Sequence, residues 1–207
     1  LATCIDQRAA IEAKFPPLNR FLTGYDLKHC FDPERETIDL SRLLAGSEGT
    51  LAFITEAKLN LTPIPSFKVL VNISYRNFDA ALRHAPVLMK ARATSVETID
   101  NTVLNLARND IIWDSVREHL SEGQADQPMD GINMVEYTGL TQSEMDDKLQ
   151  QLLQTLDREL QSGAQNQHGV VGYKVCAEAS SIQTIYAMRK KAVGLLGAVK
   201  GERKPIA

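Results

Sequence analysis

Two strand–helix–strand units follow one another in the second part of the chain, and this order constrains the fold more than any other feature. The segment FKVLVNISY, residues 67–75, has the alternation of a strand, with Phe67, Val69, Val71, Ile73 and Tyr75 on one face. A helix over 77–91 and a strand at SVETI complete the first unit. GINMVEYTG, a helix over 142–161 and HGVVGYKVC form the second. Two such units in series are typical of a ferredoxin-like α+β sandwich.

The apolar residues of the two predicted helices repeat with helical spacing. In 77–91, Asn77 is the expected N-cap and Pro86 is expected to kink the helix. The expected stripe consists of Phe78, Ala81, Leu82, Ala85, Leu88 and Met89. The stripe of 142–161 consists of Met145, Leu149, Leu152, Leu153, Leu156 and Leu160. These patterns predict helices covering one face of an antiparallel sheet.

Two further helical segments accompany these units. Residues 101–120 are predicted to be helical and lead into a polar loop, so that 101–129 form an insertion between the two halves. A last helix is predicted over 179–199.

The first 65 residues have a different organisation. A short helix over 5–15 ends at the Pro16–Pro17 pair, because proline cannot continue a helix. From Leu51 to Thr62 the sequence has a period of two, which predicts a long, half-buried strand. The residues of one face are Leu51, Phe53, Thr55, Ala57, Leu59 and Leu61. Two prolines, at 63 and 65, end this strand and mark the expected domain boundary. The predicted domains are therefore residues 1–65 and 66–207.

Composition excludes several classes of function. The formal net charge of −3 and the scattered basic residues leave no basic surface for nucleic acid. The three cysteines are far apart and form no C-x-x-C pair, which argues against a zinc ribbon and fits a reducing compartment. No apolar run reaches the length of a membrane-spanning helix, so we expect a cytoplasmic protein. The chain begins at Leu1 and ends in GERKPIA, and we interpret it as an internal fragment.

The segment GSEGT, residues 46–50, joins an apolar helix end to the predicted strand. Its glycines permit a tight turn, and this alone explains them. They also let the backbone approach a ligand closely, with hydroxyls from Ser47 and Thr50 nearby. The segment is neither a P-loop nor a G-x-G-x-x-G motif. On its own it leaves both interpretations open.

Three segments together resemble a known family. TGYDL at 23–27, LLAGSEGTLAFITEAKLNLTPIP at 43–65 and FKVLV at 67–71 resemble the FAD-linked oxidases, which are PCMH-type flavoproteins of the vanillyl-alcohol-oxidase superfamily. The resemblance is greatest to the branch of D-2-hydroxyglutarate and D-lactate dehydrogenases. One position departs from the family pattern, since Ala52 stands where the family has glycine.

The resemblance implies that the two parts of the chain belong to different domains. Residues 1–65 would be the C-terminal remnant of an FAD-binding domain, and 66–207 a ferredoxin-like substrate domain that is incomplete at its C-terminus. FAD would be the cofactor of the parent protein, with little or none bound by the isolated fragment. The residues expected along FAD are Gly46, Ser47, Glu48, Gly49, Thr50 and Ile54.

The resemblance also implies substrate ligands. Tyr186 to Arg189 match an aromatic-x-x-Arg helix, and Lys204 lies where the family has a loop lysine. Arg189 and Lys204 would hold the carboxylate of a small 2-hydroxy acid, because a guanidinium forms two parallel bonds to a carboxylate. Before the family is considered, both lie in basic runs that are more often solvated surface. The catalytic base, a divalent metal and iron–sulfur clusters would lie outside these residues.

Metal ligands are not expected within the chain. The histidines His29, His84, His119 and His168 show no ligand spacing and no evident carboxylate partner, which favours surface or packing roles. One alternative from a different class of function is a non-catalytic ferredoxin-like interaction module without cofactor. The electron acceptor and the formation of a homo-oligomer stay open.

Overall fold

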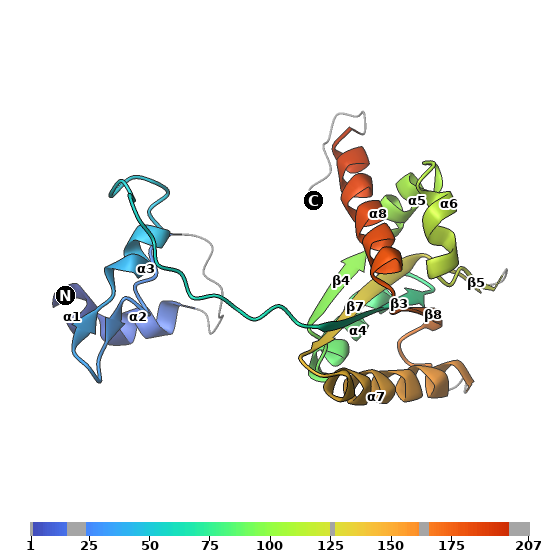
Figure 1. Ribbon diagram of the computed structural model, residues 1–207, viewed down its shortest axis with the longest axis horizontal. Helices are drawn as coiled ribbons and strands as arrows, with labels where there is room; N and C mark the ends of the chain where they lie inside the picture. The colour runs from blue at the N-terminus through green and yellow to red at the C-terminus, as the bar shows by residue number, and fades with distance from the viewer. Residues whose placement is uncertain (1, 16–23, 125–126, 162–165, 199–207) are drawn as a thin grey trace. The chain divides into compact units, whose positions relative to one another are not determined.

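The computed structural model describes residues 2–15, 24–124, 127–161 and 166–198 (Figure 1). Its contacts divide the chain into two compact units, residues 1–62 and 63–207. Each unit is described separately below.

The second unit is built on a four-stranded antiparallel sheet. Its strands are β3 (Phe67–Tyr75), β4 (Ser95–Ile99), β7 (Gly131–Gly139) and β8 (Val170–Cys176). They lie in the order β4-β7-β3-β8, so the first strand of each strand–helix–strand unit occupies the centre. This is the interleaved arrangement of a ferredoxin-like sandwich, and the α+β class predicted from the sequence is confirmed.

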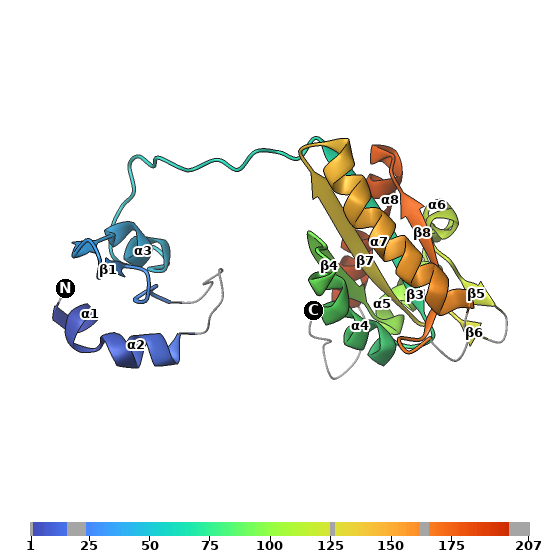
Figure 2. The ribbon, with the colours of Figure 1, turned by 90° about the horizontal axis from the view of Figure 1, so that it is seen from below.

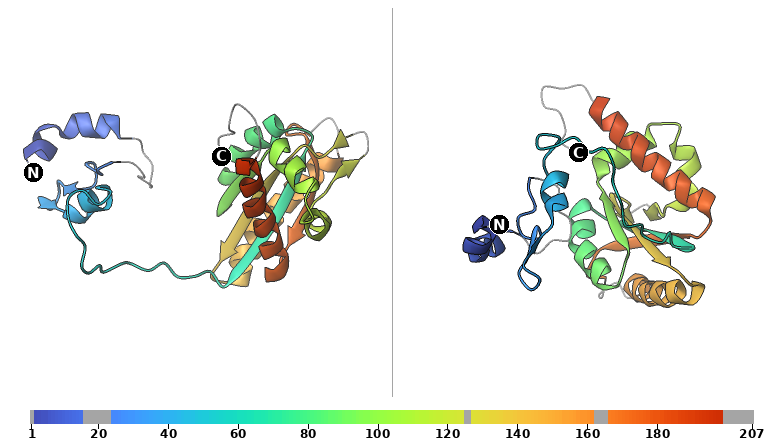
Figure 3. Two further views of the ribbon diagram at one scale, coloured as in Figure 1. Left: turned by 90° about the horizontal axis from the view of Figure 1, so that it is seen from above. Right: turned by 60° about the vertical axis from the view of Figure 1, so that its left-hand side comes forward.

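Helices cover both faces of this sheet. One face carries α4 (Phe78–Lys90) and α7 (Gln142–Gln161), as Figure 2 shows. The opposite face carries α5 (Asn101–Arg108), α6 (Trp113–Val116), the 3₁₀ turn η1 (Arg117–His119) and α8 (Ala179–Ala198) (Figure 3, left). A short ribbon of β5 (Gly123–Gln124) and β6 (Gln127–Pro128) follows η1. The two helices expected to cover one face of the sheet, α4 and α7, do so, and the helices on the opposite face form a second layer that the sequence did not predict.

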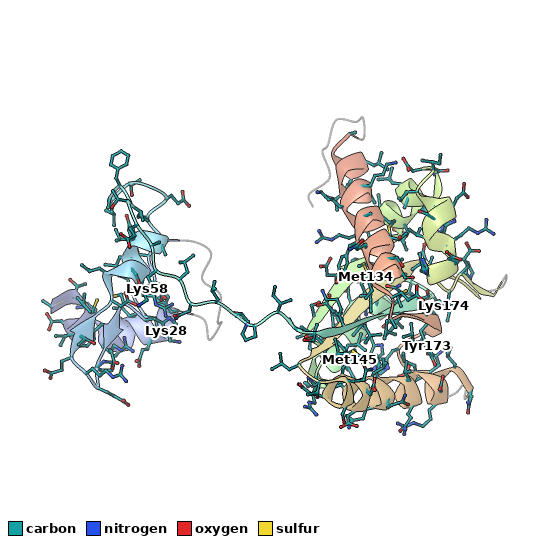
Figure 4. All side chains as sticks on the ribbon, viewed as in Figure 1. Lys28, Lys58, Met134, Met145, Tyr173 and Lys174 are labelled. Atoms are coloured by element: carbon teal, nitrogen blue, oxygen red, sulfur yellow. The ribbon has the colours of Figure 1, made fainter. Side chains whose placement is uncertain are left out.

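The reason for the second helical layer lies in the alternate residues of β3. Leu70, Asn72 and Ser74 are as inaccessible to solvent as the residues of the predicted apolar face. Two apolar clusters therefore flank the sheet, and burying each aliphatic side chain in them contributes about 1.5–3 kcal/mol. Met145 of α7 belongs to one cluster and Met134 of β7 to the other (Figure 4).

The helices α4 and α7 agree with the sequence prediction in extent. Asn77 caps α4 by accepting a hydrogen bond from the Ala80 amide at 2.8 Å, and the helix continues through Pro86. The buried stripe of α4 differs from the predicted one, since Leu82 and Met89 are half exposed. Its buried residues are Ala80, Ala81, His84 and Leu88. In α7 the predicted residues Met145, Leu149, Leu152 and Leu156 are buried, Leu153 is partly buried, and Leu160 is 39% exposed.

The first unit contains short elements. They are α1 (Ala2–Asp6), α2 (Arg8–Lys14), β1 (Phe31–Asp32), β2 (Thr37–Ile38) and α3 (Leu40–Ala45). The single helix predicted over 5–15 is interrupted at Gln7, which separates α1 from α2. The small core of the first unit consists of Cys4, Cys30 and Phe31.

The strand predicted from Leu51 to Thr62 is not observed. No described residue between 51 and 66 belongs to a strand, and the side chains of this stretch are exposed, Phe53 fully and Leu61 to 89%. An alternating pattern needs a neighbouring strand and a layer to cover its apolar face. Neither is supplied to this stretch by the described part of the chain.

No helix within the described ranges has both the length and the apolar character needed to cross a membrane. Cys4, Cys30 and Cys176 are buried free thiols.

Candidate functional site

The turn at residues 46–50 begins at Gly46, which packs against the backbone of Gly24 and Tyr25 in the TGYDL segment. Asp39 caps α3 by accepting a hydrogen bond from the Ser41 amide at 3.0 Å, and the helix ends at Gly46. A methyl group on Gly46 would collide with the carbonyl oxygen of Gly24. The structure thus brings together the two sequence motifs, and it explains Gly46 by close packing of backbone on backbone.

The hydroxyl groups of this turn bond to nearby backbone carbonyls, one in α3 and one in the turn itself. Ser47 Oγ donates to the Leu44 carbonyl at 2.9 Å, and Thr50 Oγ1 donates to the Ser47 carbonyl at 2.6 Å. These bonds stabilise the turn. Because both hydroxyl groups already donate to carbonyls, a ligand at this turn would contact mainly the backbone after Ser47.

That backbone is open to the solvent. Glu48 and Gly49 have positive φ angles of 49° and 79°, and no atom lies within 4 Å of a Cβ built on Gly49. Ile54 is 67% exposed. An uncovered glycine permits the close approach of a flat, phosphate-bearing cofactor such as FAD.

Arg189 lies on α8 at the rim of a cavity of about 450 Å³. Its Nε is 2.7 Å from Glu97 Oε2 of β4, and its side chain is 48% exposed. Glu97 Oε2 is buried and makes no well-aligned hydrogen bond among the described residues. Asp100 and the apolar Val103 and Val193 also line the cavity. The arrangement can present a guanidinium to an anion while Glu97 restricts where that guanidinium lies.

Tyr186 belongs to a second polar group on the same helix. Its hydroxyl donates to Glu136 Oε2 at 2.8 Å, and Lys68 Nζ lies 2.9 Å from the same oxygen. Burial, followed by the bond to Glu136, raises the pKa of Tyr186 above its ordinary value. A cavity of about 350 Å³ beside this group is lined by Lys68, Gln183 and Tyr186, among others. Sequence reasoning missed Lys68 and Glu136, because they come from two separate strands.

The basic run after Arg189 is partly paired. Lys191 Nζ lies 2.6 Å from Asp110 Oδ1, and this contact lowers the pKa of Asp110. Lys190 is exposed. Lys204, the second predicted substrate ligand, lies outside the described residues.

Comparison with known proteins identifies the family. Residues 64–207 match the family described as FAD linked oxidases, C-terminal domain. The chain belongs to this family of FAD-linked oxidases.

Three similar proteins that match nearly the whole chain share one name. The chain is 54% identical to a D-2-hydroxyglutarate dehydrogenase of Haemophilus influenzae and 53% identical to one of Escherichia coli, over 98% of its length in both cases. It is 43% identical to the protein of that name from Pseudomonas putida over 96% of its length. The chain spans about a fifth of the length of each of these relatives, 19% to 20%.

Three of the histidines in this member of the family have carboxylate partners, contrary to the sequence prediction. His168 Nδ1 lies 2.8 Å from Glu159 Oε1, and His29 Nδ1 lies 3.0 Å from Asp26 Oδ1. His119 Nε2 lies 3.6 Å from Oε1 of the neighbouring Glu118. His84 is buried and its Nδ1 is 2.9 Å from Tyr75 Oη. The pair of His168 and Glu159 escaped sequence reasoning because a helix end and a loop are brought together. Asp26 lies three residues before His29, and that spacing could have revealed the pair.

Proposed function

We propose that the whole protein is a flavin-dependent dehydrogenase that oxidises a D-2-hydroxy acid, and that this acid is D-2-hydroxyglutarate. The observation that carries the proposal is the identity of 53–54% to two D-2-hydroxyglutarate dehydrogenases through 98% of the chain. The family match from residue 64 onward supports it. The proposal includes a cytoplasmic location.

We assign the two ends of the chain to different parts of that enzyme. Residues 1–65 are proposed to be the C-terminal part of the FAD-binding domain, and 66–207 the substrate domain. The division of contacts between Thr62 and Pro63 supports this assignment, as does the start of the family match at residue 64. The exposed apolar side chains from Leu51 to Leu61 also support it, since an alternating segment of this kind fits a sheet in the remainder of a flavin domain.

The cofactor contacts are assigned to the turn at 46–50 and to Ile54. FAD, when bound, accepts the two electrons that leave the α-carbon of the substrate. Ser47 and Thr50 maintain the turn through their own hydrogen bonds. The backbone at Glu48 and Gly49 would contact the cofactor, and the open space around Gly49 supports this assignment. Ile54 supplies apolar contact.

Arg189 is assigned to the substrate carboxylate. Its guanidinium already lies beside a cavity and retains donors beyond the one that faces Glu97, so it can form a charge-assisted bond to a carboxylate. Glu97 acts as the positioning residue for this guanidinium. Lys204 is proposed to supply a second cation to the same carboxylate.

The direct test is a substrate screen on the full-length protein with an artificial electron acceptor. D-2-hydroxyglutarate, its L enantiomer and D-lactate are compared by kcat/KM, and bound flavin is measured by its visible absorbance. We expect a yellow protein with the highest kcat/KM for D-2-hydroxyglutarate. A higher value for D-lactate would refute the assigned substrate, and a colourless protein without activity would refute the proposed function.

A further inference from the structure

Two histidines and a glutamate from three elements meet where β3 ends and β8 begins. His84 comes from α4, Glu159 from the last turn of α7, and His168 from the loop before β8. One ligand atom from each lies within 4.8 Å of the others. The rings of His84 and His168 are stacked, with centroids 4.0 Å apart. We propose that His84, Glu159 and His168 form a binding site for one divalent cation of the zinc class.

The first support is that His84 is held in place with one nitrogen in use and one available. Tyr75 Oη lies 2.9 Å from His84 Nδ1, and Asn133 Nδ2 donates to the same Tyr75 oxygen at 3.0 Å. Asn133 is itself fixed by donating to the Ala81 carbonyl at 2.9 Å. In the tautomer in which His84 Nδ1–H donates to Tyr75 Oη, Nε2 carries no proton and can bind a metal. Metal-binding histidines ordinarily donate their second ring N–H in this way, which sets the ring orientation.

The second support is an unpartnered carboxylate oxygen. Glu159 is 8% exposed, and its Oε1 lies 2.8 Å from His168 Nδ1. Its other oxygen, Oε2, is buried and has no hydrogen-bond partner among the residues that the structure describes. Burying a carboxylate oxygen without a partner lowers the stability of the folded state, and a bound cation would supply the missing interaction.

The third support is the loop that carries His168. Asn166 bonds to both backbone groups of Val170, receiving from its amide at 2.9 Å and donating to its carbonyl at 2.7 Å. The Gly169 carbonyl accepts a hydrogen bond from the Arg76 amide at 3.0 Å, and Gly169 has a φ of +64°. The backbone beside His168 is therefore fixed, whereas the side chain of His168 is 24% exposed and has room to turn.

The donor set selects the kind of cation. Two imidazoles and one carboxylate are ligands that zinc takes in three-ligand sites, where a water molecule completes the tetrahedron. Calcium and magnesium prefer oxygen ligands, so a site with two ring nitrogens disfavours them. Ligands of one zinc ion lie about 3.3 Å apart when each is about 2.0–2.1 Å from the metal. The ligand atoms lie within 4.8 Å of one another, so side-chain rotation can bring the three residues to one ion.

Binding requires the ring stack to open. A metal lies close to the plane of each imidazole that binds it, and the His84 and His168 planes are inclined by only 8°. His168 is the ring able to rotate, because it is the more exposed of the two. A cavity of about 340 Å³ lies beside Glu159 and is also lined by Thr155, Arg158 and Gln167.

The experiment is zinc binding to the 207-residue chain after removal of metal with a chelator. Metal content is measured after equilibration with Zn²⁺ and gel filtration, and the melting temperature is measured with and without Zn²⁺. The variants are His168→Gln and Glu159→Gln, which keep side-chain volume. His119→Gln is the matched control, since His119 lies in η1 away from the cluster.

We expect the wild type and H119Q to bind one Zn²⁺ that both H168Q and E159Q lose. Zn²⁺ should raise the melting temperature of the first two proteins only. If zinc is bound elsewhere, for example by the thiols of Cys4 and Cys30, the amount of zinc per protein would be equal in all four proteins. Equal zinc content in all four, or none in the wild type, would overturn the proposal.

A measurement on the wild type alone covers the case of a variant that does not fold. Zn²⁺ should shift the NMR signals of the His84 and His168 rings and leave those of His119 unchanged. Unshifted His84 and His168 signals at saturating Zn²⁺ would equally overturn the site. Neither readout depends on flavin or on dehydrogenase activity.

Discussion

Gly46 packs so closely on Gly24 that a side chain at position 46 would collide with the carbonyl oxygen of residue 24. The contact joins the end of α3 to the segment that precedes β1. It fixes the start of the turn that we assign to the cofactor, so the shape of this turn depends on a glycine that is not itself open to the cofactor. Gly49 is the opposite case, because space around it is empty and its φ is +79°.

The first prediction concerns Gly46→Ala. Because backbone must move to admit the methyl group, we expect a loss of about 1–3 kcal/mol in the stability of the first unit. Amide hydrogen exchange in the full-length protein, followed at residues of α3, measures this loss. Bound FAD per protein should fall in the same variant.

The control for Gly46→Ala is Gly194→Ala. No atom lies within 4 Å of a Cβ built on Gly194, which is in α8. Replacing a helical glycine with alanine at an open position should be neutral or stabilising by up to about 1 kcal/mol. Unchanged exchange in Gly46→Ala would show that the contact with Gly24 does not constrain the turn.

Sequence patterns predicted the second unit well where one periodicity decided the structure. The alternation of Phe67 to Tyr75 predicted β3, and the helical repeat of 142–161 predicted the limits of α7. Both are local signals, because the residues that carry each pattern lie within a single element. The second helical layer was missed, because Leu70, Asn72 and Ser74 became buried through contact with distant helices.

The residues of the candidate sites were also predicted only in part from the sequence. Arg189 and the turn at 46–50 were found because a resemblance to a family pointed to them. Glu97, which lies beside Arg189, and the His84–Glu159–His168 cluster were missed. These groups combine residues from separate elements, and no spacing in the sequence marks such a contact. The strand predicted at 51–62 failed for a related reason, since a strand exists only with a partner.

The second prediction concerns Arg189→Ala in the full-length protein. Removing a charge-assisted bond to the substrate carboxylate should cost about 2–4 kcal/mol of binding, seen as a large rise in KM for D-2-hydroxyglutarate. Arg189→Lys should recover part of the loss, because it restores the charge and not the planar fork. The neighbouring variant Lys190→Ala should leave KM unchanged. A normal KM in Arg189→Ala would remove this residue from the substrate site.

The third prediction concerns the buried amide of Asn133 in the second unit. This side chain donates to Tyr75 Oη and to the Ala81 carbonyl, and its Oδ1 accepts from Thr98 Oγ1 at 2.7 Å. Asn133→Leu leaves these groups without their partner, and at about 1 kcal/mol or more for each we expect a total loss near 3 kcal/mol. Urea unfolding monitored by circular dichroism measures it.

The exposed Asn109 provides the comparison for Asn133. Asn109→Ala removes one exposed bond to the Asn105 carbonyl and should change stability by about 0.5 kcal/mol or less. Equal stability losses in the two variants would mean that the buried network contributes no more than a surface bond.

The fourth prediction concerns the alkaline limit of stability. Burial raises the pKa of Tyr137 to about 12, whereas an unfolded tyrosine ionises near its ordinary value of about 10. Above pH 10 the unfolded state therefore loses this proton first, and the free energy of unfolding falls as the pH rises toward 12. Below pH 10 both states keep the proton, and Tyr137 contributes no pH dependence.

Tyr137→Phe should reduce the slope of stability against pH between 10 and 12, while Tyr25→Phe, at a position 43% exposed, should not. Urea unfolding at pH 9, 10 and 11 distinguishes them, and identical slopes in the wild type and Tyr137→Phe would contradict the expected ionisation.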